Sequence, residues 1–336
     1  MLAEVAYTGN KTEHIWVAGY NENPSIYIPG NCVAGQYGLT AAGPCSNTTA
    51  ANRQARALLT LLNPSEGKFF AVNGVEQAYL DATGHYHGMK FSVQKRLSNN
   101  WSANVNYTRS KCINQGEPGT DIGTTFPVSQ IDPINNPHPD PSTNEGPCAA
   151  DRKHNVNLST VVITPDPGFG PNWLKVALKD WQVGFIYVAR SGSPITPTTT
   201  GDFALTNGPQ RPIIVPGVDP YLSEADRTWA TVGSTPSLAW FNLGAFAPNT
   251  PGVWGNTPKG YLVGPSYWNA DLSFSRNINL EKGRRVEVRI EAFNLFDTQN
   301  WANPTVQIGS TSLTNGRVTN TVGDPRIMQF ALKFNF

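Results

Sequence analysis

Segments in which apolar and polar side chains strictly alternate over about ten residues are the feature that most constrains the fold of this chain. The clearest one pairs an apolar set with a charged set: Val286, Val288, Ile290 and Ala292 against Arg285, Glu287, Arg289 and Glu291. The final segment alternates in the same way and ends on an aromatic residue, Phe336. About ten residues is also the length of a tilted strand that crosses a membrane. The pattern therefore predicts β-strands with one apolar and one polar face.

Eight segments show this alternation and are predicted to be strands. They span residues 1–9, 84–97, 100–111, 153–164, 179–191, 266–277, 284–295 and 325–336. Short and long connections alternate between them. The short or moderate ones lie near 98–100, 165–178 and 279–283, and the long ones near 10–83, 112–152, 192–265 and 296–324. An up-and-down outer-membrane barrel has this arrangement, with short periplasmic turns and long extracellular loops.

The composition agrees with strands and excludes one class of partner. With a net charge of +1 and 15% charged residues, the chain lacks the basic excess expected of a nucleic-acid-binding protein. Its 31 glycines and 27 prolines argue against a helical bundle. No stretch approaches the roughly 20 apolar residues that a transmembrane helix needs. The mean hydropathy of −0.33 is typical of a water-soluble protein, but transmembrane strands carry apolar residues only at alternate positions.

A soluble all-β fold is the alternative interpretation. β-Sandwiches also alternate apolar and polar residues, and such a protein would be a soluble carbohydrate-binding or adhesion module. However, connections of roughly 30 to 75 residues are uncommon in compact soluble domains. Charges at every second position of 285–291 suit a wet lumen better than a sandwich core. We therefore expect an all-β, antiparallel up-and-down transmembrane β-barrel with long extracellular loops.

Several motifs carry a family resemblance. The segment Val288–Asp297 resembles the penultimate strand of TonB-dependent receptors, in which a run R-x-E-x-F-N-L-F is typical. The ending is similar to the C-terminal assembly signal of outer-membrane proteins, through Phe330, Leu332, Phe334 and Phe336. Four further segments resemble the Oar-like branch of those receptors: Val5–Lys11, Asp151–His154, Arg190–Thr196 and Trp240–Phe246. The likeness extends from about residue 2 to the end.

The resemblance implies a barrel of about 22 strands closed by a plug domain, of which this chain would supply about eight strands. Residues 1–336 are expected to be the C-terminal portion, with no plug domain, TonB box or signal peptide. The implied function is ligand uptake across the outer membrane of a Gram-negative-type bacterium, with the loops capturing the ligand. The implied partners are outer-membrane lipid, the barrel-assembly machinery, TonB through the absent plug, and a siderophore, carbohydrate or peptide ligand. A small passive barrel that displays adhesive loops is a further alternative.

The four cysteines are an even set, and the outer-membrane location that the resemblance implies would be an oxidising compartment. Cys112 ends one predicted strand and Cys148 precedes the next, so a disulfide between them would close one loop, contributing about 3–4 kcal/mol. Cys32 and Cys45 lie together in the first long connection. Three pairings are formally possible, and these positions favour 32–45 with 112–148. Four free thiols are the alternative, and a zinc site is disfavoured because no C-x-x-C spacing occurs.

Charged residues at polar positions of the strands are expected to face the lumen. They are Lys90, Asp271, Arg285, Glu287, Arg289 and Glu291. Arginine or lysine facing the bilayer midplane would cost about 2–4 kcal/mol each, which favours the inward orientation. Two roles stay open, a transport pathway or ion pairs between neighbouring strands. Aromatic residues near the strand ends are expected to form two interfacial girdles: Trp101, Tyr107, Trp181, Tyr187, Tyr267 and Trp268.

The remaining candidates are weaker. His85 and His87 share a strand face but lack a third ligand, so no metal site is expected there. The stretch 132–145 is interpreted as a solvated loop rather than a Ca²⁺ site. Loop tryptophans could stack on a sugar or siderophore: Trp229, Trp240 and Trp254. The chain contains no G-x-S-x-G, H-E-x-x-H or P-loop motif. We expect neither an enzyme nor a bound cofactor.

Overall fold

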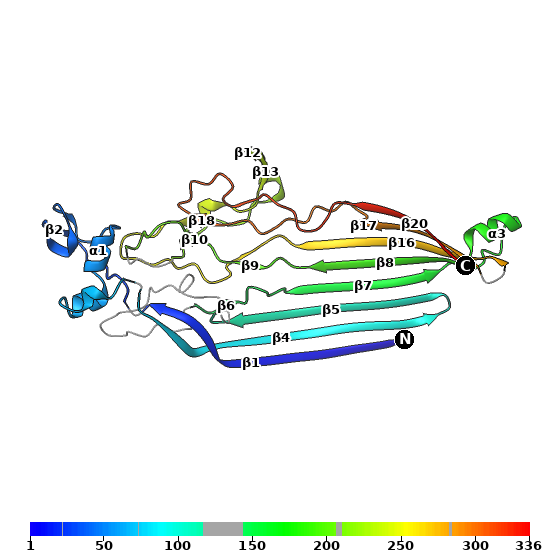
Figure 1. Ribbon diagram of the computed structural model, residues 1–336, viewed down its shortest axis with the longest axis horizontal. Coiled ribbons are helices and arrows are strands. Elements are labelled where there is room, and N and C mark those ends of the chain that lie inside the picture. The colour runs from blue at the N-terminus through cyan, green and yellow to red at the C-terminus, as the bar shows by residue number, and fades with distance from the viewer. Residues whose placement is uncertain (22, 73, 117–143, 206–209, 282–283) are drawn as a thin grey trace.

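Eight long antiparallel strands form one sheet in the computed structural model of the chain (Figure 1). The structure describes residues 1–21, 23–72, 74–116, 144–205, 210–281 and 284–336. In sheet order the strands are β1 (Leu2–Asn21), β4 (Glu76–Ser98), β5 (Trp101–Asn114), β7 (His154–Ile163), β8 (Trp181–Arg190), β16 (Tyr267–Asn279), β17 (Arg285–Phe293) and β20 (Ile327–Asn335). A short strand, β6 (Gly146–Pro147), pairs with the end of β5. All eight predicted strands are confirmed.

Short and long connections leave opposite ends of the sheet, as predicted. Figure 1 shows both chain termini and helix α3 (Asn172–Leu178) at one end and the other helices beyond the opposite end. The tightest connection joins β4 to β5 through Asn99 and Asn100, whose φ angles are 51° and 60°. Asparagine tolerates this left-handed conformation, which two-residue hairpin turns require. Helix α3, in the link between β7 and β8, was not predicted.

Backbone pairing collects the apolar rows of neighbouring strands on one face. Phe274 of β16 lies opposite Ile290 of β17, which in turn lies opposite Phe330 of β20. At the other side of the sheet, Val5 of β1 lies opposite Phe91 of β4. Because side chains alternate along a strand, the polar rows then share the second face. We call these the apolar face and the polar face.

The apolar face is exposed. Phe330 and Leu332 are 72% and 76% exposed, and Phe91 is 40% exposed. The buried hydrophobic cluster of the described residues lies elsewhere, in the long connections. A β-sandwich would bury these rows against a second sheet. The soluble all-β alternative is therefore wrong, and the exposed face has the character of a lipid-contacting surface.

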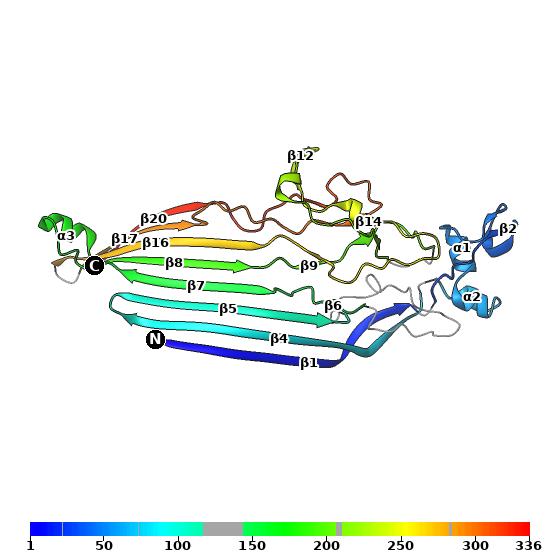
Figure 2. The same cartoon turned by 180° about the vertical axis from the view of Figure 1, so that it is seen from behind.

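The sheet is open at both edges. Figure 2 shows β1 and β20 along opposite margins, and no backbone pairing joins them in the described part of the chain. The strands thus form part of a barrel wall rather than a closed barrel.

The first hairpin is longer than predicted. The predicted segments 1–9 and 84–97 became β1 and β4, which run to Asn21 and begin at Glu76. Their pairing continues past three register shifts, the first between Thr12 and Ile15. Residues 10–13 are all polar or charged, so the alternation that reveals a membrane strand stops there although the strand continues.

Small elements build the long connections. The short sheets pair β2 (Asn31–Cys32) with β3 (Gly43–Pro44), β9 (Pro194–Ile195) with β15 (Leu262–Val263), β10 (Thr198–Thr199) with β18 (Gln307–Ile308), β11 (Ile213–Ile214) with β14 (Phe246–Ala247), and β12 (Trp229–Val232) with β13 (Thr235–Ala239) and β19 (Arg317–Val318). The described parts of the connections also contain helices α1 (Ala50–Ala55) and α2 (Leu58–Leu62) and the 3₁₀ turns η1 (Gln36–Gly38), η2 (Gly67–Phe69), η5 (Glu224–Asp226) and η6 (Leu243–Ala245). None of the helices described in the structure combines the length and the apolar character needed to cross a membrane.

Candidate functional site

The described parts of the four long connections fold against one another at the outer end of the sheet. We call this assembly the loop cap, and it comprises residues 23–75 without 73, 144–153, 191–266 without 206–209, and 294–326. Its buried apolar cluster combines residues of the last two connections: Phe241, Ala245, Phe246, Leu262, Val306 and Ile308. Strand pairs β10–β18 and β13–β19 join the same two connections through the backbone. The loop cap therefore has a core of its own.

Two disulfides close loops within this region, and both predicted pairings are confirmed. Cys32 is bonded to Cys45, and the pair holds β2 and β3 together. Cys112, near the end of β5, is bonded to Cys148, which follows β6. The backbone N–H of Cys148 also donates to the carbonyl of Cys112, with N and O 3.1 Å apart. This second disulfide ties the base of the second long connection to the sheet.

Arg56 is fully buried and links the first connection to the third. Its guanidinium donates to the side-chain oxygen of Asn52 at 2.8 Å and to the carbonyls of Ile26, Asn47 and Leu205. Burial lowers the pKa of Arg56 to about 10, partly offset by the nearby carboxylate of Asp202. Since most of its partners are neutral oxygens, Arg56 links the loops through hydrogen bonds rather than ion pairs.

Two more buried cations tie the third connection to the end of β5 and to the second connection. The ammonium of Lys259 donates to the side-chain oxygen of Asn114 at the end of β5. The guanidinium of Arg211 donates to the side-chain oxygen of Asn144. Both cations are less than a tenth exposed. The loop cap is thus cross-linked by buried basic residues that the sequence alone did not single out.

All six residues predicted to face the lumen lie on the polar face. Lys90 lies opposite Thr108, and Glu291 lies opposite Ser273. Asp271 accepts hydrogen bonds from the backbone N–H of Asn294 and the side chain of Asn269, both at 2.9 Å. Asp271 therefore fixes the turn that follows β17. That this face lines a lumen stays a prediction.

The charges of β17 pair along the strand rather than between strands. Arg289 forms an ion pair with Glu287, and its Nη1 lies 3.8 Å from an oxygen of Glu291. The prediction of inter-strand ion pairs is therefore wrong for this row. Residues two apart on a strand share a face and lie about 7 Å apart, a distance that a long arginine side chain spans.

Aromatic residues mark two levels on the apolar face. Trp101 and Trp181 lie near the periplasmic end, whereas Tyr107 and Tyr187 lie six positions further along their strands, toward the loop cap. These positions match the predicted girdles. Tyr267 does not, because it is adjacent to Trp268 and so points to the polar face, where the Arg190 guanidinium lies 4.6 Å from its ring centroid.

The predicted sugar-stacking tryptophans Trp229 and Trp240 have different surroundings. Trp240 packs against the buried cluster, and the Arg227 guanidinium covers its ring at 3.9 Å. Trp229 is 59% exposed and makes an edge contact with Trp301. Trp240 is therefore structural, and stacking at Trp229 or Trp254 stays a prediction.

The histidine and calcium candidates have different outcomes. The Nδ1 of His87 is hydrogen bonded to the hydroxyl of Tyr7 at 2.6 Å. No group of three metal-ligating side chains occurs among the residues that the structure describes. The stretch 132–143 lies outside the described residues, while Asn144 of the same stretch binds Arg211.

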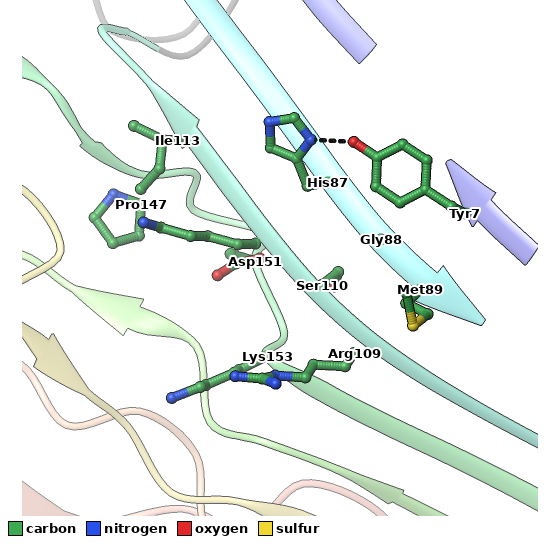
Figure 3. Close-up of a pocket in the computed structure, with 11 residues that line it drawn as sticks. Tyr7, His87, Gly88, Met89, Arg109, Ser110, Ile113, Pro147, Asp151 and Lys153 are labelled. Carbon is green, nitrogen blue, oxygen red and sulfur yellow. Dashed lines mark hydrogen bonds between the residues drawn. The ribbon is translucent and has the colours of Figure 1, made fainter. Parts of the chain in front are cut away.

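A hollow of about 570 Å³ lies at the outer rim of the apolar face and was not predicted. We call it the rim hollow. Figure 3 shows Tyr7 and His87 on adjacent strands, with Arg109 of β5 and Lys153 ahead of β7 among the other lining residues. The signal for it lies in the sequence, because the apolar row of β5 continues past Tyr107 as two cations, Arg109 and Lys111.

Comparison with known proteins agrees with this geometry. A model of the outer membrane β-barrel domain matches residues 1–329, from the start of the chain into β20. The chain belongs to this family. Its place is therefore the outer membrane, with the apolar face of the sheet toward lipid. No curated protein and no solved structure matches the chain.

Proposed function

We propose that this outer membrane β-barrel protein is the C-terminal wall of a TonB-dependent, Oar-like receptor that takes up a ligand through its loop cap. The open sheet carries the proposal. In lipid every backbone polar group needs a partner, so the free edges of β1 and β20 require further strands. A larger barrel supplies those strands and encloses a lumen wide enough for a plug.

The motif at the end of β17 supports this assignment through its geometry. Arg289 and Glu291 point to the polar face, and Phe293, two residues further on and 41% exposed, lies on the same face. Asn294 then turns the chain, with a φ of 49° and its amide donating to the carbonyls of Thr298 and Asp324 at 3.1 Å. The Arg, Glu and Phe positions of the R-x-E-x-F-N run thus share the polar face, and its Asn forms the turn that ends the strand.

Ligand capture by the loop cap is supported by its internal order. Buried cations, disulfides and a small core hold the described parts of the connections in one arrangement. Binding costs less when loops are ordered beforehand, because little conformational entropy is then lost. Loops that merely shielded the rim would not need such cross-links.

Disulfide trapping in intact outer membranes tests the larger barrel. We expect a cysteine pair at Val288 and Leu332, which lie directly opposite in β17 and β20, to cross-link within the chain. Single cysteines along residues 3–8 of β1, each combined with one along 328–333 of β20, should not. Efficient cross-linking within one chain between β1 and β20 would show a self-closed small barrel and contradict the proposal.

Depletion of medium components tests the transport step. Cells with and without the gene for this protein, each with and without functional TonB, are compared by mass spectrometry of the medium. We expect one component whose depletion needs both the gene and TonB. Depletion that needs the gene but proceeds equally without TonB would instead favour a passive pore or loop display.

A further inference from the structure

On the apolar face, side chains change from apolar to basic on two neighbouring strands, one same-face position further out on β4 than on β5. On β5, Tyr107 is followed on the same face by Arg109 and Lys111. On β4, Met89 lies opposite Arg109 and His87 lies opposite Lys111. The long connections leave the sheet at this end, so the change marks the outer edge of the apolar band. In a membrane, the headgroups of the outer leaflet lie at this level.

The rim hollow sits at this change and combines two kinds of lining. The cations and apolar residues that line it are Arg109, Lys111 and Lys153 with Met89, Ile113 and Pro147. The hydrogen-bonded Tyr7 and His87 also line it (Figure 3). Such a lining suits a ligand that has an anionic group next to an apolar one.

Among the described residues that line the hollow, the cations outnumber the carboxylates. Within the described chain, none of Arg109, Lys111 and Lys153 forms an ion pair with a carboxylate. One acidic residue, Asp151, lines the hollow, and its Oδ1 accepts the backbone N–H of Cys112 at 3.1 Å. The lining therefore keeps an excess of positive charge despite this carboxylate.

We propose that the rim hollow binds the phosphate group of an outer-leaflet lipid. Clustered arginine and lysine residues at a membrane surface attract anionic headgroups, and arginine matches the geometry of phosphate oxygens. Met89, where the hollow adjoins the apolar band, contacts the hydrophobic part of the same lipid, which a free anion lacks. This site depends on the membrane orientation of the barrel and not on TonB-dependent transport, so it can fail or hold independently of the proposed function.

Lipid retention by the complete protein, purified from outer membranes in detergent, tests the site. The probes are diphosphorylated lipid A and the same glycolipid with its phosphates removed, and native mass spectrometry measures the bound fraction. We expect the phosphorylated form to bind more tightly. The double variant Arg109→Gln/Lys111→Gln should weaken its binding on the order of tenfold. Equal affinity for both forms, or no change in the double variant, would overturn the proposal.

Two single variants separate binding from folding. Lys90 neighbours Met89 on β4 but points to the polar face, so Lys90→Gln should leave lipid retention unchanged. Asp151→Asn removes the carboxylate of the described lining and keeps an acceptor for the Cys112 N–H, so it should tighten binding severalfold. If the double variant does not fold, Asp151→Asn tests the site instead, and an unchanged or weaker affinity for diphosphorylated lipid A would contradict the proposal.

Inorganic phosphate distinguishes a lipid from a free anion. At equal concentration, inorganic phosphate should not displace diphosphorylated lipid A, because it cannot use the apolar lining. Displacement at equal concentration would show a simple anion site and overturn the assignment to lipid.

Discussion

The sheet and the loop cap of this protein are stabilised for two different solvents. In the sheet, large apolar side chains such as Leu332 stay exposed, at 76%, while the opposite face is polar. In the loop cap, Phe246 and Val306 are 6% and 3% exposed, and Arg56 is fully buried among carbonyl and amide oxygens. The sheet has the surface of a membrane protein and the loop cap has the interior of a water-soluble one.

The sheet and the loop cap should therefore be sensitive to different perturbations. Membrane strands keep all backbone hydrogen bonds within the sheet and depend on lipid to cover their apolar residues. The loop cap depends on cross-links and on internal partners for its buried polar groups. Perturbations confined to one region should therefore leave the other intact.

Removing the disulfide between Cys112 and Cys148 is expected to have the largest effect. Cys112→Ser/Cys148→Ser opens a loop with a sequence separation of 36 residues and should destabilise the loop cap by about 4 kcal/mol in the chain-entropy model. Limited proteolysis of intact cells should show faster cleavage of the loops. Cys32→Ser/Cys45→Ser, with a separation of 13, is the comparison and should cost about 3 kcal/mol. Loss of the membrane-embedded sheet in either variant would show that the two regions are not independent.

A charge on the apolar face should destabilise only the sheet. Leu332→Arg places a guanidinium in lipid and is expected to cost about 3 kcal/mol in the free energy of folding into lipid vesicles. Ala331→Arg, one residue earlier, is the matched control, because it points to the polar face. Urea titrations of both variants should differ by that amount. Equal destabilisation would mean that the apolar face does not contact lipid.

The terminal aromatic residue should matter for assembly more than for final stability. Phe336 is fully exposed and stacks on Phe334, with ring centroids 6.1 Å apart. At the membrane interface, Phe336→Asp should cost only about 1 kcal/mol or less at equilibrium. In cells, however, we expect most of the protein to fail to reach the outer membrane. Outer-membrane fractionation measures this, with Phe336→Tyr as the control, and normal levels of the aspartate variant would contradict an assembly signal.

The smallest effect is expected at Asp151, where the two regions meet. Burial raises the pKa of the Asp151 carboxyl above its ordinary value of 3.8. Because the folded state binds this proton more tightly than the unfolded chain, stability decreases as the pH rises through the folded pKa. Asp151→Asn should therefore stabilise the loop cap at neutral pH, by less than about 1 kcal/mol because the group is partly solvated. Between pH 4 and pH 7, the resistance of the loop cap to protease should depend less on pH in Asp151→Asn than in the unchanged protein. The same pH dependence in both proteins would contradict this prediction.

The sequence predicted the sheet well because strand periodicity is local. Alternation over about ten residues revealed every long strand and both faces. The alternation could not reveal that β1 extends to Asn21, because residues 10–13 are uniformly polar. This part of β1 is held by backbone pairing with β4 and not by an apolar row. The alternation also placed Tyr267 and Trp268 in one girdle, although neighbours on a strand point to opposite faces.

The candidate site was predicted less completely. The disulfides followed from the positions of the cysteines relative to the strands. The buried cations could not be predicted, because their partners are far away in the sequence. Arg56 donates to the carbonyl of Leu205, 149 residues away, and Lys259 donates to Asn114, 145 residues away. The ion pairs of β17 were expected between strands, yet Arg289 reaches its neighbours along its own strand.

The sequence by itself determined the order of the strands, the lipid-facing rows and the end of the sheet that carries the long connections. These properties depend on side chains two residues apart and on the lengths between strands. Only the tertiary structure decided three features of the described residues. Both sheet edges are open, the described parts of the four connections share one cross-linked loop cap, and Lys153 joins Arg109 and Lys111 at the rim hollow. Those features arise from contacts between segments that are far apart in the sequence. A pattern of neighbouring residues contains no information about such contacts.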